Sequence, residues 1–284
     1  MTSRTRSESA GVGVAGADVG ASLIKVATRE AGNGTRYHTF PAGDLEAAAA
    51  RLAASRPARV AVTGGGAPHL ARLLTSDTAR VAEFDAWSAG ARHLLREGGR
   101  EPERFLLVSL GTGTSALLVD PSGVRRVGGT ALGGGTLVGL GRALLGTSRF
   151  EEIAALAAAG DRRRVDLLVR DVYPEGGFQL PPDINAASFA RLARLAHGEA
   201  PAPADVAHAL MGLVGENVAL ICCGLAAATG VEPIVFGGSP LRGNPALEDV
   251  LRLVCLAFGR QPIFLPQGEF AGALGALERA AADA

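Results

Sequence analysis

The stretch FLLVSLGTGTSALLVD, residues 105–120, decides the fold of this chain. An apolar run enters a knot of glycine and threonine and continues as a second apolar run, a pattern typical of two strands joined by a tight turn. A near-copy, VGVAGADVGASLIKVA, occupies residues 12–27. Glycine permits the sharp turn in both copies because it adopts backbone conformations that other residues avoid. The recurrence of one unit in both halves predicts a duplicated α/β fold.

The composition sets broad limits on size, partners and compartment. The chain has 284 residues, 48% of them hydrophobic, enough for one large domain or two of ordinary size. Its formal net charge is +0, so electrostatics gives no reason to expect a nucleic acid or a membrane surface as partner. The cysteines, Cys222, Cys223 and Cys255, fit no common zinc spacing and are interpreted as core residues in a reducing compartment, the cytoplasm.

Two stretches could be mistaken for a signal peptide or a membrane-spanning helix. Residues 1–10, MTSRTRSESA, are polar and lack the apolar core of a signal peptide, so we interpret them as a disordered leader. Residues 209–230, ALMGLVGENVALICCGLAAATG, are strongly apolar, but Glu216 and Asn217 interrupt them midway. A buried helix accounts for this stretch better than a membrane span.

The hydrophobic pattern and the turn-forming residues predict the other elements. In chain order these are a strand, turn and helix over 58–74, a short strand over 79–83, a helix over 86–99 capped by Asp85, a second hairpin over 105–128, a glycine-rich run leading into a helix over 128–146, a largely helical region over 150–212 with a loop at 173–186, a long helix over 204–229, a strand at 233–240, a helix over 245–259, a strand at 261–266 and a last helix over 271–282. We expect a boundary at Pro102 between an N-terminal domain, residues 11–102, and a C-terminal domain, residues 103–284. The last helix is a candidate to pack back on the first domain.

The two hairpin turns are the best candidates for phosphate binding. The chain has no Walker A motif, and the G-x-G-x-x-G at residues 11–16 lacks the preceding strand of a dinucleotide-binding fingerprint. Asp18–Ser22 and Gly111–Ser115 each bring backbone N–H groups and hydroxyls to a turn that an anion can approach closely. One such turn in each half can clamp a polyphosphate, and Asp18 offers a carboxylate to a phosphate-bound Mg²⁺ or its waters.

Further glycines and one lysine extend this candidate site. Gly133–Gly135 precede a helix, whose N-terminal N–H groups and positive dipole end suit a phosphate; a hinge or close helix packing is the alternative. FGGSP, residues 236–240, also lies between a strand and a helix. Lys25, the only lysine among 28 Lys and Arg residues, lies within the first turn motif, although a solvated strand end would also explain it.

Carboxylates and arginines are candidates to handle an acceptor alcohol. Glu83 lies between a strand and a helix, where it can accept the proton of an alcohol, whereas Asp85 is assigned to capping. Arg125 or Arg126 can hold a carboxylate or phosphate, or simply form the solvated end of a hairpin. The histidines lack an H-x-x-x-H spacing, so we expect none to bind a metal. DRRRVD, residues 161–166, is interpreted as a charged helix surface.

These motifs together resemble one family. The paired strand–turn–strand units are similar to those of actin, hexokinase and the heat-shock ATPases, and EFDA and RVGGTALGGGT resemble segments of the type II pantothenate kinases. DVGASLIKV, TGGGA, SLGTGTS, GGSPLRGNPAL and GEFAGALGAL extend the resemblance over nearly the whole chain. It implies duplicated RNase H-like, actin-like ATPase domains with a cleft between them. It also implies ATP- and Mg²⁺-dependent phosphorylation of pantothenate, the first step of coenzyme A synthesis, by a homodimer built on the long helix.

The resemblance also implies roles for individual residues. Glu83 matches the catalytic base, Arg126 matches the arginine that holds the substrate, and Thr112 lies where phosphate is expected to change hands. Together with the turn residues, the expected nucleotide-binding set is Asp18, Gly20, Ala21, Ser22, Leu23, Ile24, Lys25, Gly111, Gly113, Thr114, Gly134, Gly135, Thr136, Phe150, Gly238 and Ser239. Two residues depart from the family pattern: Ala21 narrows a turn that often reads Gly-Gly-Thr, and Trp87 is bulky beside the base motif.

Two other functions compete with this interpretation. A sugar-type kinase of the same superfamily would favour an Asn-Asp pair near the base, and repressor-type sugar kinases carry a cysteine-rich zinc motif; the sequence has neither. A non-catalytic sensor of ATP or acyl-CoA would not need its catalytic groups, yet Asp18, Glu83 and Arg126 are all present.

Overall fold

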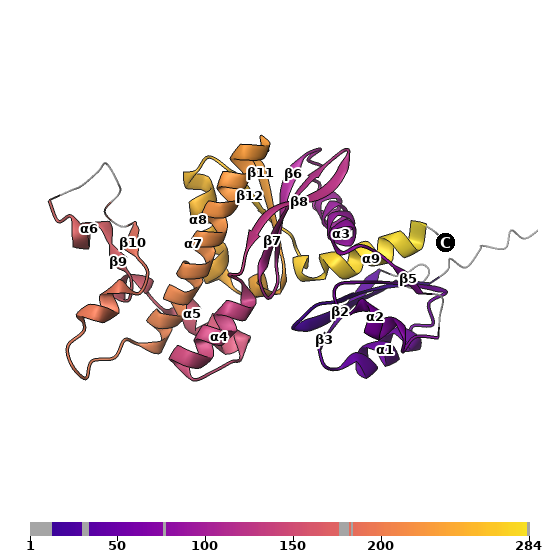
Figure 1. The fold of residues 1–284 in the computed structure, drawn as a ribbon, viewed down its shortest axis with the longest axis horizontal. Helices are drawn as coiled ribbons and strands as arrows, with labels where there is room; N and C mark the ends of the chain where they lie inside the picture. The colour runs from indigo at the N-terminus through magenta and orange to yellow at the C-terminus, as the bar shows by residue number, and fades with distance from the viewer. Residues whose placement is uncertain (1–12, 30–33, 76–77, 176–181, 183, 283–284) are drawn as a thin grey trace, which may run out of the picture. The chain divides into compact units, whose positions relative to one another are not determined.

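The computed structural model describes residues 13–29, 34–75, 78–175, 182 and 184–282 (Figure 1). The leader expected at residues 1–10 and part of the loop expected at 173–186 lie outside these residues. The chain divides into two compact units. Unit 1 comprises residues 1–101 and 270–284, and unit 2 comprises residues 102–269, so the last helix belongs to unit 1.

Unit 1 contains a five-stranded mixed sheet among its described residues. Its strands are β1 (Val14–Val19), β2 (Leu23–Arg29), β3 (Thr35–Pro41), β4 (Arg59–Thr63) and β5 (Thr78–Arg80). They lie in the order β3-β2-β1-β4-β5. β1, β2 and β3 form an antiparallel meander, whereas β4 and β5 run parallel to β1. The hairpin expected at residues 12–27 is therefore confirmed, and the structure adds β3, which the sequence pattern did not reveal.

Helices cover both faces of the unit 1 sheet. Helices α1 (Leu45–Ala54) and α2 (Ala67–Ala71) lie on one face, α9 (Ala271–Ala282) lies on the other, and α3 (Glu83–Glu97) packs on α9. Because side chains alternate along a strand, Ala15 and Ala17 of β1 pack with α1 and α2, whereas Val14 packs with α9 on the opposite face. Asp18 shares the side of Val14 and therefore faces α9.

Helices α3 and α9 pack with their backbones almost in contact. A Cβ added at Gly275 of α9 would overlap the backbone oxygen of Ala86, and one added at Gly90 of α3 would overlap that of Ala271. Only glycine permits this approach. An ion pair of 2.6 Å between Arg29 of β2 and Glu278 further ties α9 to the sheet. The end of the chain is thus an integral layer of unit 1.

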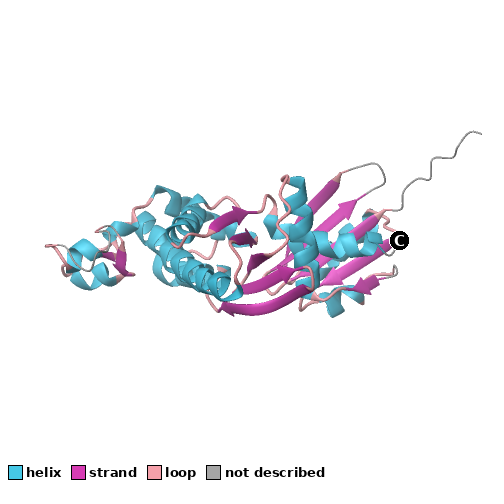
Figure 2. Cartoon of the chain, turned by 90° about the horizontal axis from the view of Figure 1, so that it is seen from above, coloured by secondary structure: helices cyan, strands magenta, loops and turns pink. Residues whose placement is uncertain are grey.

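Unit 2 repeats the same sheet topology. Figure 2 draws the helices and strands of the chain from a second direction. The five-stranded sheet of unit 2, within the described residues, comprises β6 (Phe105–Leu110), β7 (Thr114–Asp120), β8 (Gly123–Thr130), β11 (Pro233–Gly237) and β12 (Gln261–Phe264). The order β8-β7-β6-β11-β12 corresponds strand for strand to the order in unit 1. β6, β7 and β8 are antiparallel, and β11 and β12 run parallel to β6. The duplicated α/β fold expected from the sequence is confirmed.

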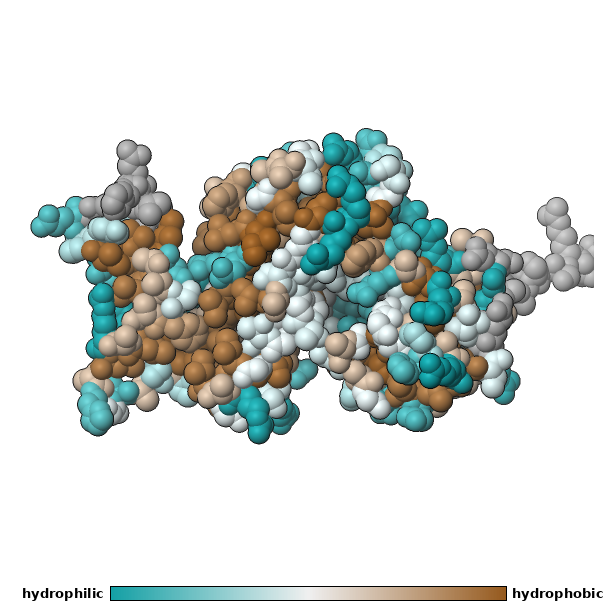
Figure 3. Space-filling model, viewed as in Figure 1, coloured by the Kyte–Doolittle hydropathy of each residue, from teal (hydrophilic) through white to brown (hydrophobic). Residues whose placement is uncertain are grey.

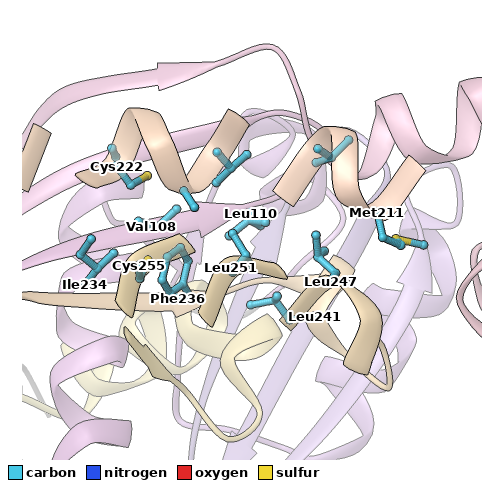
Figure 4. Packing of buried hydrophobic residues seen from close by; sticks show 14 of the residues in the cluster. Val108, Leu110, Met211, Cys222, Ile234, Phe236, Leu241, Leu247, Leu251 and Cys255 are labelled. Carbon is cyan, nitrogen blue, oxygen red and sulfur yellow. The ribbon is translucent and has the colours of Figure 1, made fainter. Parts of the chain in front are cut away.

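The core of unit 2 lies between its sheet and a layer of helices (Figure 4). These are α4 (Gly134–Leu145), α5 (Phe150–Ala159), α7 (Pro203–Thr229) and α8 (Pro245–Ala257). Helix α7 is long and apolar enough to cross a membrane, but 61% of its most apolar window is buried inside the protein. Met211 and Cys222 of α7 belong to the same buried cluster as Val108 and Phe236 of the sheet. The expected buried helix is therefore present.

The region between α5 and α7 differs from expectation. Residues 150–212 are expected to be largely helical, with a loop at 173–186, but between α5 and α7 the described residues hold only short elements: η1 (Arg162–Arg164), β9 (Leu167–Leu168), α6 (Val169–Val172), β10 (Asn185–Ala187) and η2 (Ala190–Arg194). The segment DRRRVD is not a charged helix surface. Arg162 pairs with Glu216 of α7 at 2.5 Å and with the fully buried Asp166 at 3.0 Å. These charges hold the segment against α7 instead of facing water.

The start of α3 also corrects the sequence interpretation. The short strand β5 ends at Arg80, and α3 begins at Glu83 with Ala82 at its N-cap, so Asp85 does not cap the helix. Glu83 and Asp85 both lie in the first turn, where the helix dipole favours carboxylates. Two carboxylates in one turn made the true start ambiguous. Helix α1 was not predicted, and the short 3-10 turns η3 (Ser239–Leu241) and η4 (Gly268–Phe270) complete the described elements.

The glycine contact between α3 and α9 predicts a large effect of one methyl group. Gly275→Ala should lower the free energy of unfolding by about 1–3 kcal/mol, because the new Cβ must push the two helices apart. Gly139→Ala in α4 is the matched control, since a Cβ there meets nothing within 4 Å. It should be neutral or stabilising by up to about 1 kcal/mol, because alanine favours helix. Urea unfolding measures both; equal effects would contradict the tight contact.

Candidate active site

Three polar side chains converge on the α9 face of the unit 1 sheet. Asp18 of β1 lies opposite Lys25 of β2 and opposite Thr63 of β4. All three are buried, with exposed fractions of 4%, 9% and 1%. They occupy the ends of their strands beside the Gly20 turn, where one cation and two oxygen-bearing groups can act on the same ligand.

Burial dominates the electrostatics of Asp18. It raises the pKa of this carboxyl to about 6; the Lys25 ammonium opposes the rise and the Glu83 carboxylate adds to it. Asp18 and Glu83 are therefore close enough to influence each other. The hydroxyl oxygen of Thr63 is also buried and has no hydrogen-bond partner among the described residues. A buried hydroxyl usually makes a hydrogen bond, so this arrangement is consistent with a site in which a bound ligand supplies the hydrogen-bond partner of Thr63.

The first turn presents its backbone rather than its apolar side chains. Gly20 donates its N–H to the Leu23 oxygen at 3.1 Å, and Ala21 and Ser22 are exposed at the tip. Ile24 is fully buried in the sheet core, so its side chain is unavailable to a nucleotide. Lys25 reaches back toward the turn, with its ammonium 3.8 Å from the position of a Cβ at Gly20.

Glu83 is the first residue of α3 and is exposed, as is Asp85. The positive end of the helix dipole favours a carboxylate at this position. Trp87, one turn further along α3, is 5% exposed. The sequence suggested only that its bulk changes the pocket; the structure buries it in unit 1.

In unit 2, the second turn and the start of α4 form one hydrogen-bonded structure. Gly134 and Gly135 donate their N–H groups to the oxygens of Gly111 and Thr112 at 2.8 and 2.9 Å. Thr114 donates its hydroxyl to the Leu132 oxygen at 2.7 Å. The N–H groups expected to be free for phosphate at Gly134 and Gly135 are thus bonded to the turn, and close packing accounts for these glycines.

The third glycine segment of unit 2 joins the same place. Pro240 of η3 packs on α4: a Cβ added at Gly134 would lie 2.9 Å from its Cγ and 3.0 Å from the Gly111 oxygen. Gly238, with a φ of 134°, passes so close to β6 that a Cβ there would overlap the Leu110 oxygen. The sequence segments 111–115, 134–136 and 238–239 therefore meet in one cradle, which we call the glycine cradle.

Arg126 is brought toward the turn by an irregularity in β8. The pairing with β7 passes from Ala116–Gly128 to Leu117–Arg126, which leaves Val127 as a bulge. Nη2 of Arg126 lies 2.7 Å from the position of a Cβ at Gly129, near the end of the strand. Phe150, expected near the nucleotide, packs against the core of unit 2. The described residues contain no group of three or more His, Cys, Asp or Glu side chains placed to hold a metal.

Comparison with known proteins identifies a family and relatives by sequence. Residues 45–279 match the protein family described as Fumble. The type II pantothenate kinase of Staphylococcus haemolyticus (strain JCSC1435) is 33% identical over 262 residues, which cover 92% of this chain and 98% of that protein. The type II pantothenate kinase of Staphylococcus aureus (strain USA300) is 32% identical over 263 residues, covering 92% and 97%.

Solved structures share the fold at low sequence identity. Component A of the (R)-2-hydroxyglutaryl-CoA dehydratase of Acidaminococcus fermentans matches with a TM-score of 0.65 and 18% identity, over 96% of this chain and 99% of that one. A ROK family glucokinase from Streptomyces griseus, in complex with glucose and AMPPNP, matches with a TM-score of 0.57 and 15% identity, over 94% and 99%. Both support a two-unit, actin-like ATPase fold.

The raised pKa of Asp18 predicts that this residue limits stability. Its pKa is about 6 in the folded protein, compared with the usual 3.8. At a pH above 6 the carboxyl is therefore ionised in both states, and its charge lowers the free energy of unfolding. Asp18→Asn should raise the free energy of unfolding at pH 8 by about 1–3 kcal/mol. The gain should shrink as the pH falls below 6 and vanish below the usual pKa of 3.8, as urea unfolding at several pH values can measure.

Asp120→Asn is the control with the opposite sign. Hydrogen bonds from Ser122 lower the pKa of the Asp120 carboxyl, so its ionised form favours the fold. This variant should lose stability at pH 8. A gain in both variants would mean only that removing any negative charge helps, and would contradict a specific cost of burying Asp18.

Proposed function

The chain belongs to the type II pantothenate kinase family, and from this premise we propose how its own residues carry the reaction. It transfers the γ-phosphoryl group of ATP to the primary hydroxyl of pantothenate, giving 4'-phosphopantothenate in the first step of coenzyme A synthesis. The observation that carries the assignment of residues is the buried Asp18, which shares one sheet face with the only lysine of the chain and lies within the field of Glu83.

Asp18, Lys25 and Thr63 are the proposed phosphate and Mg²⁺ groups of unit 1. A hard cation with its water shell suits Asp18, which would hold Mg²⁺ through water, and the unpartnered hydroxyl of Thr63 offers a further oxygen. Bound Mg²⁺ would neutralise the phosphate oxygens. Lys25 adds a positive charge beside the backbone N–H groups of the Gly20 turn. The surrounding burial strengthens each of these interactions.

Unit 2 is proposed to contribute the glycine cradle to ATP. Its glycines let three backbone segments pack closely together, and the nucleotide is proposed to bind beside this backbone. Because Gly134 and Gly135 are bonded to the second turn, we assign them a structural part, and phosphate contacts to exposed Thr112 and to Thr136. The other residues of the nucleotide set predicted from the sequence stay in the proposal, with Ile24 and Phe150 limited to backbone contacts by their packing.

Glu83 is proposed as the general base and Arg126 as the pantothenate clamp. An exposed carboxylate at a helix start can accept the hydroxyl proton as the alcohol attacks phosphorus. Pantothenate carries a carboxylate, and a guanidinium matches it with two parallel hydrogen bonds. The bulge at Val127 supports this role because bulges commonly re-aim a neighbouring side chain.

Replacing each carboxylate in turn distinguishes the role of Glu83 from that of Asp85. Glu83→Gln should lower kcat for pantothenate by about 10²–10⁴-fold, because the amide cannot take the proton. Asp85→Asn, in the same helical turn and equally exposed, should leave kcat within the same order of magnitude. ATP consumption with pantothenate, pantetheine and glucose measures both variants. A fully active Glu83→Gln enzyme would refute the base assignment, and turnover of glucose alone would favour the sugar kinase.

We also propose a homodimer formed through α7 and α8. Both helices expose large apolar side chains: Leu220 and Ile221 on α7, and Leu253 and Leu256 on α8. Figure 3 shows hydrophobic surface over this part of unit 2. Gly224, in the same exposed stripe of α7, has open space at its Cβ position, so a second helix could approach closely. The free, buried cysteines support a reducing compartment, and we propose the cytoplasm.

A charge placed on this surface tests the dimer. Leu220→Arg should convert the dimer to a monomer, because an arginine cannot be buried there without a partner. Leu144→Arg is the control: Leu144 on α4 has a similar exposed fraction, 50% against 46%, but lies off the proposed surface. Sedimentation velocity measures both. A wild-type monomer, or a dimer that persists in Leu220→Arg, would contradict this interface.

A further inference from the structure

The indole of Trp87 and the carboxylate of Asp18 meet at one glycine of α9. A Cβ added at Gly272 would lie 2.6 Å from Oδ2 of Asp18 and 3.0 Å from Nε1 of Trp87. Both polar atoms therefore face the same point in the first turn of α9. A Cβ at residue 272 would crowd both atoms, so their placement around Gly272 depends on three segments that are distant in the sequence.

The packing of α3 fixes Trp87 in this position. Trp87 follows Glu83 by one helical turn, so the two side chains lie on the same side of α3. It is 5% exposed, and the backbone of α3 is held against α9 at Gly90. The indole has little freedom to turn away. One short piece of helix thus presents the proposed base on its exposed first turn and an indole on its buried second turn.

The chemistry of the two groups is complementary. The indole Nε1–H can only donate a hydrogen bond, and an ionised carboxylate can only accept. A buried tryptophan usually gives its N–H a partner. Lys25 approaches Asp18 from the neighbouring strand, whereas Trp87 approaches from the helix layer. Two donors of different charge, the Lys25 ammonium and the indole N–H, are therefore placed near this carboxylate.

We propose that Trp87 is a positioning residue for Asp18: its indole N–H orients the carboxylate toward Mg²⁺·ATP, and its ring keeps bulk water from the inner side. This inference rests on the proposed function, since it gives Trp87 a part in the nucleotide site. It assigns a role to Trp87, a residue that departs from the family pattern. Trp87 supports the group that holds the metal and does not itself touch the acceptor alcohol.

Removing the N–H while keeping an aromatic ring tests the positioning role. Trp87→Phe should raise the Mg²⁺ concentration for half-maximal rate, at saturating ATP, by about 10-fold, the effect typical of losing a group that supports a metal ligand. The KM for pantothenate should stay unchanged. Leu94→Val is the control, because Leu94 is buried on the same side of α3 two turns further on. It should leave the Mg²⁺ dependence unchanged, although both variants lose some stability.

Fluorescence gives a readout independent of turnover, because Trp87 is the only tryptophan of the chain. Adding Mg²⁺ and the non-hydrolysable analogue AMP-PNP to the wild-type protein should change the indole emission, and Asp18→Asn should abolish the change. Unchanged wild-type emission at saturating analogue, or an unchanged Mg²⁺ dependence in an active Trp87→Phe enzyme, would overturn the positioning role alone. A wild-type enzyme that does not phosphorylate pantothenate would instead overturn the proposed function.

Discussion

A carboxylate kept inside unit 1, away from most water, is the constraint around which the candidate site is built. Asp18 lies near the end of β1 and is 4% exposed, and burial raises its pKa to about 6. A buried charge is unfavourable unless it finds a cation or hydrogen bonds. Lys25 provides part of that compensation, and the proposed Mg²⁺·ATP provides the rest. The unliganded protein is therefore expected to give up stability for the capacity to bind its nucleotide.

Because the fold is duplicated, each unit has a turn at the same place in its sheet, but different chemical groups surround the two turns. In unit 1 the turn adjoins a carboxylate and an ammonium, both buried on one sheet face. In unit 2 the turn is bonded to the start of α4 and packed against η3, so its donors are largely committed to structure. Charge is thus concentrated in the first unit, and closely packed backbone in the second. A kinase needs both, since phosphoryl transfer depends mainly on positioning and charge neutralisation.

The sequence predicted the features that depend on local pattern. Both strand–turn–strand units, α7, α8 and α9 follow from apolar periodicity and glycine, which act within a few residues. The sequence could not reveal that Arg162 and Asp166 turn toward Glu216 of α7, because that choice depends on partners far along the chain. It also missed the start of α3, where either Glu83 or Asp85 satisfies the local signals. The meeting of Trp87 with Asp18 requires the packing of α9, which no local pattern encodes.

Proton release on nucleotide binding is the sharpest test of whether Asp18 receives the metal–nucleotide complex. With a pKa of about 6, Asp18 is about half protonated at pH 6 in the free protein and must ionise when it binds the Mg²⁺ shell. Calorimetry of Mg²⁺·AMP-PNP binding at pH 6, in buffers of different ionisation enthalpy, counts the protons released. We expect the wild type to release about half a proton more than Asp18→Asn does on binding. Equal proton release by the two proteins would contradict the role proposed for Asp18.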